Sequence, residues 1–363
     1  MKLIGIDARL YYETGVGVYI RNFLHYLQKS APDEYRFNVY VLQKNSSQIH
    51  FENPHFMKRE VSSRWHTFSE QMIFHRVLMN DKLDLMHFTY FSYPVLYSRP
   101  FIATIHDLTP LLFKTGKAST LPSFVYEAKH TIFSYILKQQ VKKARAIITP
   151  TKAVKNQITE IYGEKYKKKI SVLYEGVNYE FFNVKPNTEL HKAFSKPYFL
   201  YVGNFYPHKN VDTLIDAFIH LQNKNVDLIL AGPDNYFSGQ IEKKLFEANI
   251  TNIRMFHPSA PADLLYLYKN CISLVNPSIS EGFGLPVVEA AYCGCPIIAS
   301  DIEVFKEILG DSYISFHPLD TLELSLRLRE MIEGRSPKIP RLNPTFSFEQ
   351  MVTGYLDLLP SIV

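Results

Sequence analysis

The chain has 363 residues, of which 46% are hydrophobic and 21% are charged, and its formal net charge is +5. A chain of this length is too long to fold around a single hydrophobic core, and it fits two domains of roughly 150 to 200 residues each. No apolar run approaches the roughly 20 residues of a membrane span, which excludes an integral helical membrane protein.

Three cysteines, Cys271, Cys293 and Cys295, are odd in number and clustered. A single glycine separates the last two, whereas common zinc and redox pairs have a two-residue spacer. We therefore expect reduced, partly buried thiols, which are typical of a cytosolic protein.

The N-terminal segment predicts a strand, a glycine loop and a helix. Residues 2–7 form an apolar run that is too short for a signal peptide, and helical spacing of apolar residues follows over 19–27. Between them, Gly15 and Gly17 resemble the start of a G-x-G-x-x-G fingerprint, but Ile20 replaces the third glycine. A nicotinamide cofactor is thus weakly supported. Glycines at such a turn more simply let a ligand or a facing domain approach the backbone.

Two histidines end predicted strands in the first half. An alternating strand over 35–42 and an amphipathic helix over 65–79 precede apolar strands that end at His87 and His106. Open α/β sheets bind ligands at the carboxyl ends of their strands, so His106 is a candidate site residue. The alternative is a histidine whose hydrogen bonds are satisfied within its loop. Further strands over 146–149 and 170–173, with helices between, indicate a βαβ pattern.

The second half repeats this pattern after an irregular segment, residues 178–196, which is the best linker candidate. A strand then ends at Gly203, and the turn that follows contains Lys209. This lysine is either an ordinary surface residue or a point charge for a phosphate. Two similar α/β halves favour a ligand cleft between them.

A further strand, loop and helix occupy residues 271–296. The apolar run 271–275 is a plausible buried strand, and Gly282-Phe283-Gly284 forms a loop with little side-chain bulk. Pro286 suits the first helical position, so we expect a helix to start near Leu285. The N–H groups and positive dipole end of such a helix favour an anion such as a diphosphate.

Two acids flank this glycine loop. Glu289 would lie about one turn inside the helix, where a carboxylate can accept hydrogen bonds from a vicinal diol such as a ribose. Glu281 precedes the loop. The alternative is an ordinary βα unit whose acids face solvent.

Positive charge is concentrated between residues 138 and 169, a segment that contains ten lysines and arginines but only two glutamates. The segment is either a solvated face or a surface attracted to anionic lipid headgroups. Nucleic acid is a weaker interpretation, since no recognition motif accompanies the charge.

Taken together, the motifs resemble glycosyltransferase family 4, with the GT-B fold, and in particular its mannosyltransferase-like bacterial members. The segments that carry the resemblance are GIDARLYYETGVG, HFTYFSYP, TIHDLTPLLF, LYEGVN, YVGNFYPHKN, FSFEQM and EGFGLPVVEA, the last matching the family's E-x7-E signature. The resemblance implies an α/β protein with two Rossmann-like parallel-sheet domains facing across a cleft. The expected parts are an acceptor-side domain 1–180, a linker 181–196, a nucleotide-sugar domain 197–345, and a helix 346–363 returning to the first domain.

The resemblance also assigns roles to individual residues. It places Glu281 against the hydroxyls of the donor sugar and Glu289 on the ribose. His106 would lie near the anomeric carbon and the acceptor. The backbone of Phe283, Gly284 and Leu285 would contact the sugar and the diphosphate, and Lys209 would neutralise the diphosphate, with Gly203 in the same binding set. From the facing domain, Gly15 and Gly17 would approach the phosphates or the acceptor. Relatives often carry arginine where this chain has Val18, Asn204 and His208.

These assignments imply a retaining, metal-independent transfer of a hexosyl group, with mannosyl favoured. The sequence contains no Asp-x-Asp pair, so Lys209 and the helix start near Leu285 would meet the leaving-group charge in place of a metal. The donor would be a GDP- or UDP-linked sugar, with no separate cofactor. The acceptor would be a sugar or a lipid-linked glycan in surface polysaccharide synthesis.

We expect a cytoplasmic enzyme, with peripheral contact to the inner face of the membrane and no nucleic-acid partner. The alternatives are a sugar-nucleotide hydrolase or epimerase of the same fold, and a non-catalytic nucleotide-sugar-binding protein.

Overall fold

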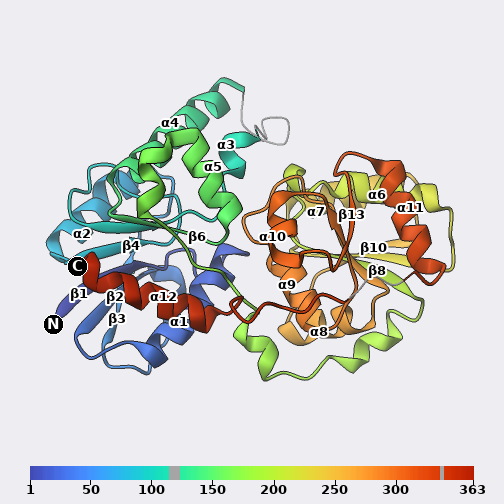
Figure 1. Cartoon of the computed structure of the whole chain (residues 1–363), viewed down its shortest axis with the longest axis horizontal. Coiled ribbons are helices and arrows are strands. Elements are labelled where there is room, and N and C mark those ends of the chain that lie inside the picture. The colour runs from blue at the N-terminus through green and yellow to red at the C-terminus, as the bar shows by residue number, and fades with distance from the viewer. Residues whose placement is uncertain (114–122, 336–338) are drawn as a thin grey trace. The chain divides into compact units, whose positions relative to one another are not determined.

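The computed structural model describes residues 1–113, 123–335 and 339–363 (Figure 1). The chain divides into two compact units. Unit 1 comprises Met1–Glu175 and Thr345–Val363, and unit 2 comprises Gly176–Pro344. The segment that we expected as a linker, 181–196, lies within unit 2; it contains the end of one short 3-10 turn (Tyr179–Phe182) and all of a second (Thr188–Lys192).

Unit 1 is built on a seven-stranded parallel sheet within the described residues, in the order β3-β2-β1-β4-β5-β6-β7. Its strands are β1 (Lys2–Asp7), β2 (Tyr35–Leu42), β3 (Phe56–Val61), β4 (Leu85–Phe88), β5 (Phe101–Thr104), β6 (Ala146–Thr149) and β7 (Ile170–Val172). The strand order reverses between β1 and β4, and ligands of such sheets bind beyond the carboxyl ends of the strands at this point.

Helices pack on this sheet and bury its strands. They are α1 (Val16–Ser30), α2 (His75–Asn80), α3 (Thr109–Leu112), α4 (Ser123–Lys143), α5 (Lys152–Tyr162) and α12 (Phe348–Leu358). All four residues of β4 are buried, as expected for a parallel strand covered on both faces. Met86 and Phe88 join one core cluster, while His87 packs against Phe23 of α1 and Tyr355 of α12.

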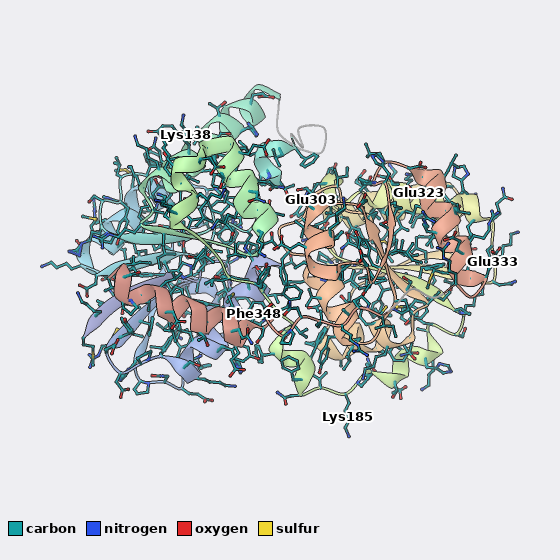
Figure 2. The ribbon with its side chains drawn as sticks, viewed as in Figure 1. Lys138, Lys185, Glu303, Glu323, Glu333 and Phe348 are labelled. Atoms are coloured by element: carbon teal, nitrogen blue, oxygen red, sulfur yellow. The ribbon has the colours of Figure 1, made fainter. Side chains whose placement is uncertain are left out.

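The C-terminal helix α12 belongs to unit 1 although the preceding 169 residues belong to unit 2. It lies beside α1, as the red and blue helices of Figure 1 show. Phe348, labelled in Figure 2, is buried at its start, and Gly354 lies so close to Leu173 that an added Cβ would be 2.7 Å from the leucine side chain. This helix therefore packs against α1, against His87 of β4 and against Leu173 after β7.

Unit 2 contains a second parallel sheet, six-stranded in the described residues, in the order β10-β9-β8-β11-β12-β13. Its strands are β8 (Tyr198–Val202), β9 (Asp227–Ala231), β10 (Ile253–Phe256), β11 (Ser273–Asn276), β12 (Ile297–Ser300) and β13 (Ile314–Phe316). Its helices are α6 (Val211–Leu221), α7 (Tyr236–Glu247), α8 (Pro261–Asn270), α9 (Leu285–Tyr292), α10 (Glu303–Leu309) and α11 (Thr321–Ile332). The strand order reverses between β8 and β11, so the loops after these two strands meet at the ligand-binding edge.

Most strands lie where the apolar runs predicted them, but two details differ. The helix expected over 65–79 begins at residue 68, and it contains a π-helical segment (Glu70–Phe74) that continues into α2. Arg9, fully buried, donates to Glu70 at 2.6 Å and thereby fixes this irregular segment to the end of β1. Pro286 occupies the second rather than the first position of α9.

Candidate active site

Lys209 and Glu281 meet at the point where the strand order of unit 2 reverses. Lys209 ends a 3-10 turn after β8, and Glu281 lies in the loop after β11. The ammonium Nζ lies 2.8 Å from both carboxylate oxygens of Glu281. Ser278 Oγ donates to Oε1 of the same carboxylate at 2.7 Å. These two residues, 72 positions apart, therefore form one largely buried ion pair.

A backbone bond fastens the two loops that carry this pair. Ile279 N donates to the carbonyl oxygen of His208 at 2.9 Å. At the end of β8, Gly203 N donates to Ala231 O, and a Cβ added at Gly232 would lie 2.2 Å from Gly203 O. The turn after Gly203 is thus held tightly from the β9 side as well as from the β11 side.

The glycine loop after Glu281 leads into α9. Gly284 caps this helix with φ of 88°, in the left-handed region that favours glycine. A Cβ added there would lie 2.8 Å from the ring of Phe305, so the position excludes a side chain sterically as well. Phe283 is buried, and Leu285 is the first helical residue, as predicted. The positive end of α9 therefore points into the loop beside Glu281.

Glu289 lies one turn inside α9 and is buried. Tyr268 of α8 donates its hydroxyl to Oε2 of Glu289 at 3.0 Å. Burial raises the pKa of Glu289 to about 7, and the hydrogen bond from Tyr268 opposes that shift only in part. The two acids of the E-x7-E segment thus differ in environment. Glu281 is paired with a cation, whereas Glu289 forms no ion pair with any residue that the structure describes.

The remaining predicted residues lie in unit 1. Gly15 is the N-cap of α1 with φ of 67°, and nothing lies within 4 Å of a Cβ added there. At Gly17, an added Cβ would lie 2.8 Å from Tyr11 O and 2.9 Å from Leu10 O. The close approach at Gly17 is therefore to its own preceding loop, whereas Gly15 leaves space.

His106 follows β5 by two residues and is buried with both ring nitrogens engaged. Nδ1 lies 3.1 Å from Oε1 of Glu175, and Nε2 lies 2.9 Å from the carbonyl oxygen of Thr89. The edge of the ring packs against Tyr19, with ring centroids 4.6 Å apart. Burial lowers the pKa of His106, but the hydrogen bond and charge of Glu175, with Thr89 and Asp107, outweigh it and raise the pKa.

Two buried acid–base clusters of unit 1 were not anticipated from the sequence. One is the contact of His106 with Glu175. The other is Arg9, which donates to Asp7 at 2.7 Å and to Glu70 at 2.6 Å. The partners lie 69 and 61 positions apart in the two long-range pairs, so no local pattern could have indicated them.

The three cysteines are free thiols. In the described part of the chain, no group of three or more His, Cys, Asp or Glu side chains is arranged to hold a metal ion. No helix among the described residues is both long and apolar enough to cross a membrane.

Two family models match the chain, one to each unit. The model described as Glycosyltransferase Family 4 matches residues 14–181, and that described as Glycosyl transferases group 1 matches residues 187–341. This chain belongs to glycosyltransferase family 4. The glycosyltransferase is accordingly an enzyme, and the loops after β8 and β11 lie in the second of the two matched regions.

Individual proteins agree with this assignment. The glycosyltransferase is 28% identical over 285 residues to the O-antigen chain mannosyltransferase RfbU of Salmonella typhimurium, covering 77% of this chain and 73% of that protein. Its fold is similar to that of sucrose-phosphate synthase from Thermosynechococcus elongatus, with a TM-score of 0.72, 15% identity and coverage of 100% and 95% of the two chains. HepE of Anabaena, in complex with UDP and glucose, gives a TM-score of 0.70 at 16% identity, with coverage of 99% and 97%. The fold is therefore GT-B, with two parallel-sheet α/β domains.

Proposed function

We propose that this glycosyltransferase moves a hexosyl group, with mannosyl favoured, from a nucleoside diphosphate sugar to a sugar or lipid-linked glycan acceptor. The observation that carries the proposal is the ion pair of Lys209 with Glu281 beside the start of α9. Such a transfer creates a nucleoside diphosphate, whose negative charge must be met by preorganised donors or by a metal. Lys209 and the positive end of α9 supply two such donors at one place.

The two glutamates are suited to the two ends of the donor. Glu281 presents carboxylate oxygens that can accept hydrogen bonds from sugar hydroxyls once the donor diphosphate competes for Lys209. Glu289 keeps Oε1 for a ribose hydroxyl, because Tyr268 donates to Oε2. In this proposal Gly203, Phe283, Gly284 and Leu285 contribute backbone contacts to the sugar and diphosphate.

We infer a retaining reaction without a metal, by a route in which the leaving phosphate helps to deprotonate the acceptor hydroxyl on the same face of the sugar. No protein nucleophile is then required. In this proposal Glu281 binds hydroxyls of the donor sugar, and Ser278 Oγ donates to its Oε1 at 2.7 Å. His106 would lie at the acceptor end, with Gly15 and Gly17 on the same unit.

The name of the relative RfbU supports mannose as the sugar and O-antigen as the class of product. The test is a thermal-shift screen of GDP-mannose, UDP-glucose and dTDP-glucose, followed by transfer assays with glycan acceptors. Donor binding to the native state raises the melting temperature. We expect the largest shift with GDP-mannose, and transfer with retained anomeric configuration that a chelator does not reduce.

The same experiment separates the alternatives. Donor hydrolysis at a rate that no acceptor changes would favour a hydrolase, and interconversion of the donor sugar would favour an epimerase. Tight donor binding without turnover on any acceptor would favour a binding protein. If nicotinamide dinucleotides leave the melting temperature unchanged, the hypothesis that the protein is a dehydrogenase is rejected.

We also propose that unit 1 binds the surface of an anionic membrane, where lipid-linked acceptors reside. Three segments lie side by side there, because Gln71 Nε2 donates to Tyr93 O at 3.1 Å, and Lys143 Nζ donates to Val95 O at 2.8 Å. These segments expose large apolar side chains, of which Phe68 is 80% exposed and Leu96 is 72% exposed. We propose that the exposed apolar side chains of these segments act together as one apolar face; they are Phe68, Met72, Ile73, Leu96, Ile132 and Tyr135.

Basic side chains border this apolar face. Lys138, labelled in Figure 2, and Lys142 are exposed on α4 at helical spacing from Tyr135. Apolar residues that enter the interface, flanked by lysines that meet anionic headgroups, are the combination that binds peripheral proteins. Part of the basic run has another role, since Lys169 Nζ donates to the carbonyls of Lys142 and Ala144 at the end of α4.

A further inference from the structure

The hydrogen bonds of His106 determine where its protons are. A carbonyl oxygen carries no proton, so Nε2 must donate its own proton to Thr89 O, 2.9 Å away. An ionised carboxylate only accepts, so with Glu175 in that form Nδ1 also donates, to Oε1 of Glu175 at 3.1 Å. A ring that donates from both nitrogens is an imidazolium, and its charge balances that of Glu175.

The surroundings hold the ring in one orientation. Thr89 is itself fixed, because its hydroxyl donates to Asp7 O at 2.5 Å at the end of β1. Tyr19 of α1 packs against the ring and donates to, or accepts from, Thr104 Oγ1 at 3.2 Å. Glu175 is 4% exposed and has His106 as a hydrogen-bonded partner.

Few other titratable groups face the ring. Asp107 adds a smaller attraction on the same loop, although its carboxylate already accepts from Thr109 N at 2.7 Å. From β4, His87 is neutral, because burial and the nearby charge of His106 lower its pKa to about 3. From α1, Tyr19 stays protonated, since burial raises its pKa. Glu175 is thus the one hydrogen-bonded countercharge among the described neighbours.

We propose that Glu175 is the positioning residue of His106: its carboxylate keeps the ring doubly protonated and oriented, so that His106 acts in transfer as a fixed cation and not as a base. This inference rests on the proposed function, which places His106 at the acceptor end. Glu175 is also the last residue of unit 1, and Gly176 is the first of unit 2. The residue that orients His106 therefore lies at one of the two places where the chain passes from one unit to the other.

Glu175→Gln removes the negative charge of this residue but keeps a side chain of the same size that can still bond to Nδ1 of His106. A glutamine amide can donate its N–H to Nδ1, so the ring keeps its orientation and its bond to Thr89 but loses the second proton. We expect the ring nitrogens of wild type to show the imidazolium signature by nitrogen-15 NMR at pH 7, and those of Glu175→Gln to show a neutral ring. Transfer at pH 7 should fall by roughly tenfold or more through kcat, with KM for the donor unchanged. Activity of the variant should recover as the pH is lowered.

Two controls keep the test sharp. Asp107→Asn removes a nearby carboxylate that does not bond to the ring, and it should leave the ring protonated at pH 7. Glu175→Asp keeps the charge, and it should restore part of the imidazolium population and of kcat.

A wild-type ring that is singly protonated at pH 7 would overturn the inference without any variant, even if Glu175→Gln failed to fold. An unchanged ring titration in a folded Glu175→Gln would do the same. If instead the ring titration moves as expected but transfer does not change, the positioning holds and the role of His106 in the proposed function is wrong. Loss of transfer in His106→Gln alongside an unmoved Glu175→Gln titration would leave the proposed function standing and remove the inference.

Discussion

Lys209 Nζ lies 2.8 Å from each carboxylate oxygen of Glu281, so under the proposed function a donor diphosphate would meet a lysine whose charge is already paired. The negative charge of the ligand must compete with that of Glu281 for the same ammonium group. The exposed fractions of the two side chains, 21% and 9%, show that solvent screens this competition only partly.

We therefore predict opposite effects on product affinity from the two partners. Glu281→Gln releases Lys209, and the free nucleoside diphosphate should bind roughly three- to tenfold more tightly, the equivalent of about 1 kcal/mol. Lys209→Met should weaken the same binding. Both variants should lose transfer by about a hundredfold or more, because each removes a group that contacts the reacting donor. Isothermal titration with GDP and UDP, beside transfer assays, measures both effects.

Lys306→Met is the matched control for this pair, since Lys306 forms an exposed ion pair with Asp301 at 3.0 Å in the same unit. Its product affinity and its transfer rate should equal those of wild type. Equal weakening of product binding by Glu281→Gln and Lys209→Met would contradict the competition between Glu281 and the diphosphate.

Gly284 and Gly294 have similar backbone angles, with φ of 88° and 73°, but different surroundings. Gly284→Ala adds a contact of 2.8 Å with Phe305, whereas a Cβ at Gly294 meets nothing within 4 Å. Both variants should suffer the strain of a left-handed alanine, about 1 kcal/mol, and only Gly284→Ala should lose donor binding. Urea unfolding and donor thermal shifts distinguish them, and equal donor affinity in the two variants would show that the loop tolerates displacement.

Glu289 predicts a dependence of stability on pH. Its pKa is about 7 in the folded chain, because burial penalises the charged form, against an ordinary value of 4.5. Below pH 4.5 the group is protonated in both states, and its contribution is complete. Between pH 4.5 and 7 the folded chain retains a proton that the unfolded chain has lost, so the free energy of unfolding falls by about 3 kcal/mol over this interval and levels off above pH 7.

Glu289→Gln carries no charge and should not show this loss. Urea unfolding of both proteins at pH 5 and pH 8 tests the prediction: the variant should gain stability relative to wild type at pH 8. A difference between the two proteins that is the same at both pH values would rule out a titrating Glu289. Tyr268→Phe should raise the pKa further, because the hydroxyl of Tyr268 stabilises the carboxylate.

The apolar face of unit 1 predicts binding to vesicles. Phe68→Ser and Leu96→Ser should each weaken binding to phosphatidylcholine vesicles that contain phosphatidylglycerol, measured by flotation. Lys138→Gln and Lys142→Gln should weaken it roughly fivefold each, about 1 kcal/mol per lysine, and salt should weaken it further. Phe246→Ser is the control, since Phe246 is 84% exposed in unit 2. If all five variants bound the vesicles as tightly as wild type, the proposal that this face binds membranes would be wrong.

Periodicity and turn chemistry predicted the elements of this fold well, because parallel strands buried on both faces are continuous apolar runs. The helix start at Leu285 and the strands that precede His106 and Gly203 are confirmed. What sequence reasoning could not supply are the partners of the charged groups. Glu281 pairs with Lys209, and His106 with Glu175, because sheet topology brings together loops about seventy residues apart. The helix expected from residue 65 begins at residue 68, and its π-helical segment carries Glu70, which Arg9 contacts from the loop after β1.

The return of α12 to unit 1 affects the order in which the chain can be completed during synthesis. Domains usually finish folding from the N-terminus as they emerge from the ribosome. Here unit 2 is complete in sequence before unit 1, because unit 1 still lacks Thr345–Val363 when Pro344 has been made. Until then Phe23 and His87 lack the ring of Tyr355 that covers them. The half of the enzyme that is translated first is therefore the half that closes last, and a ribosome stalled before residue 345 would leave an apolar groove open to chaperones.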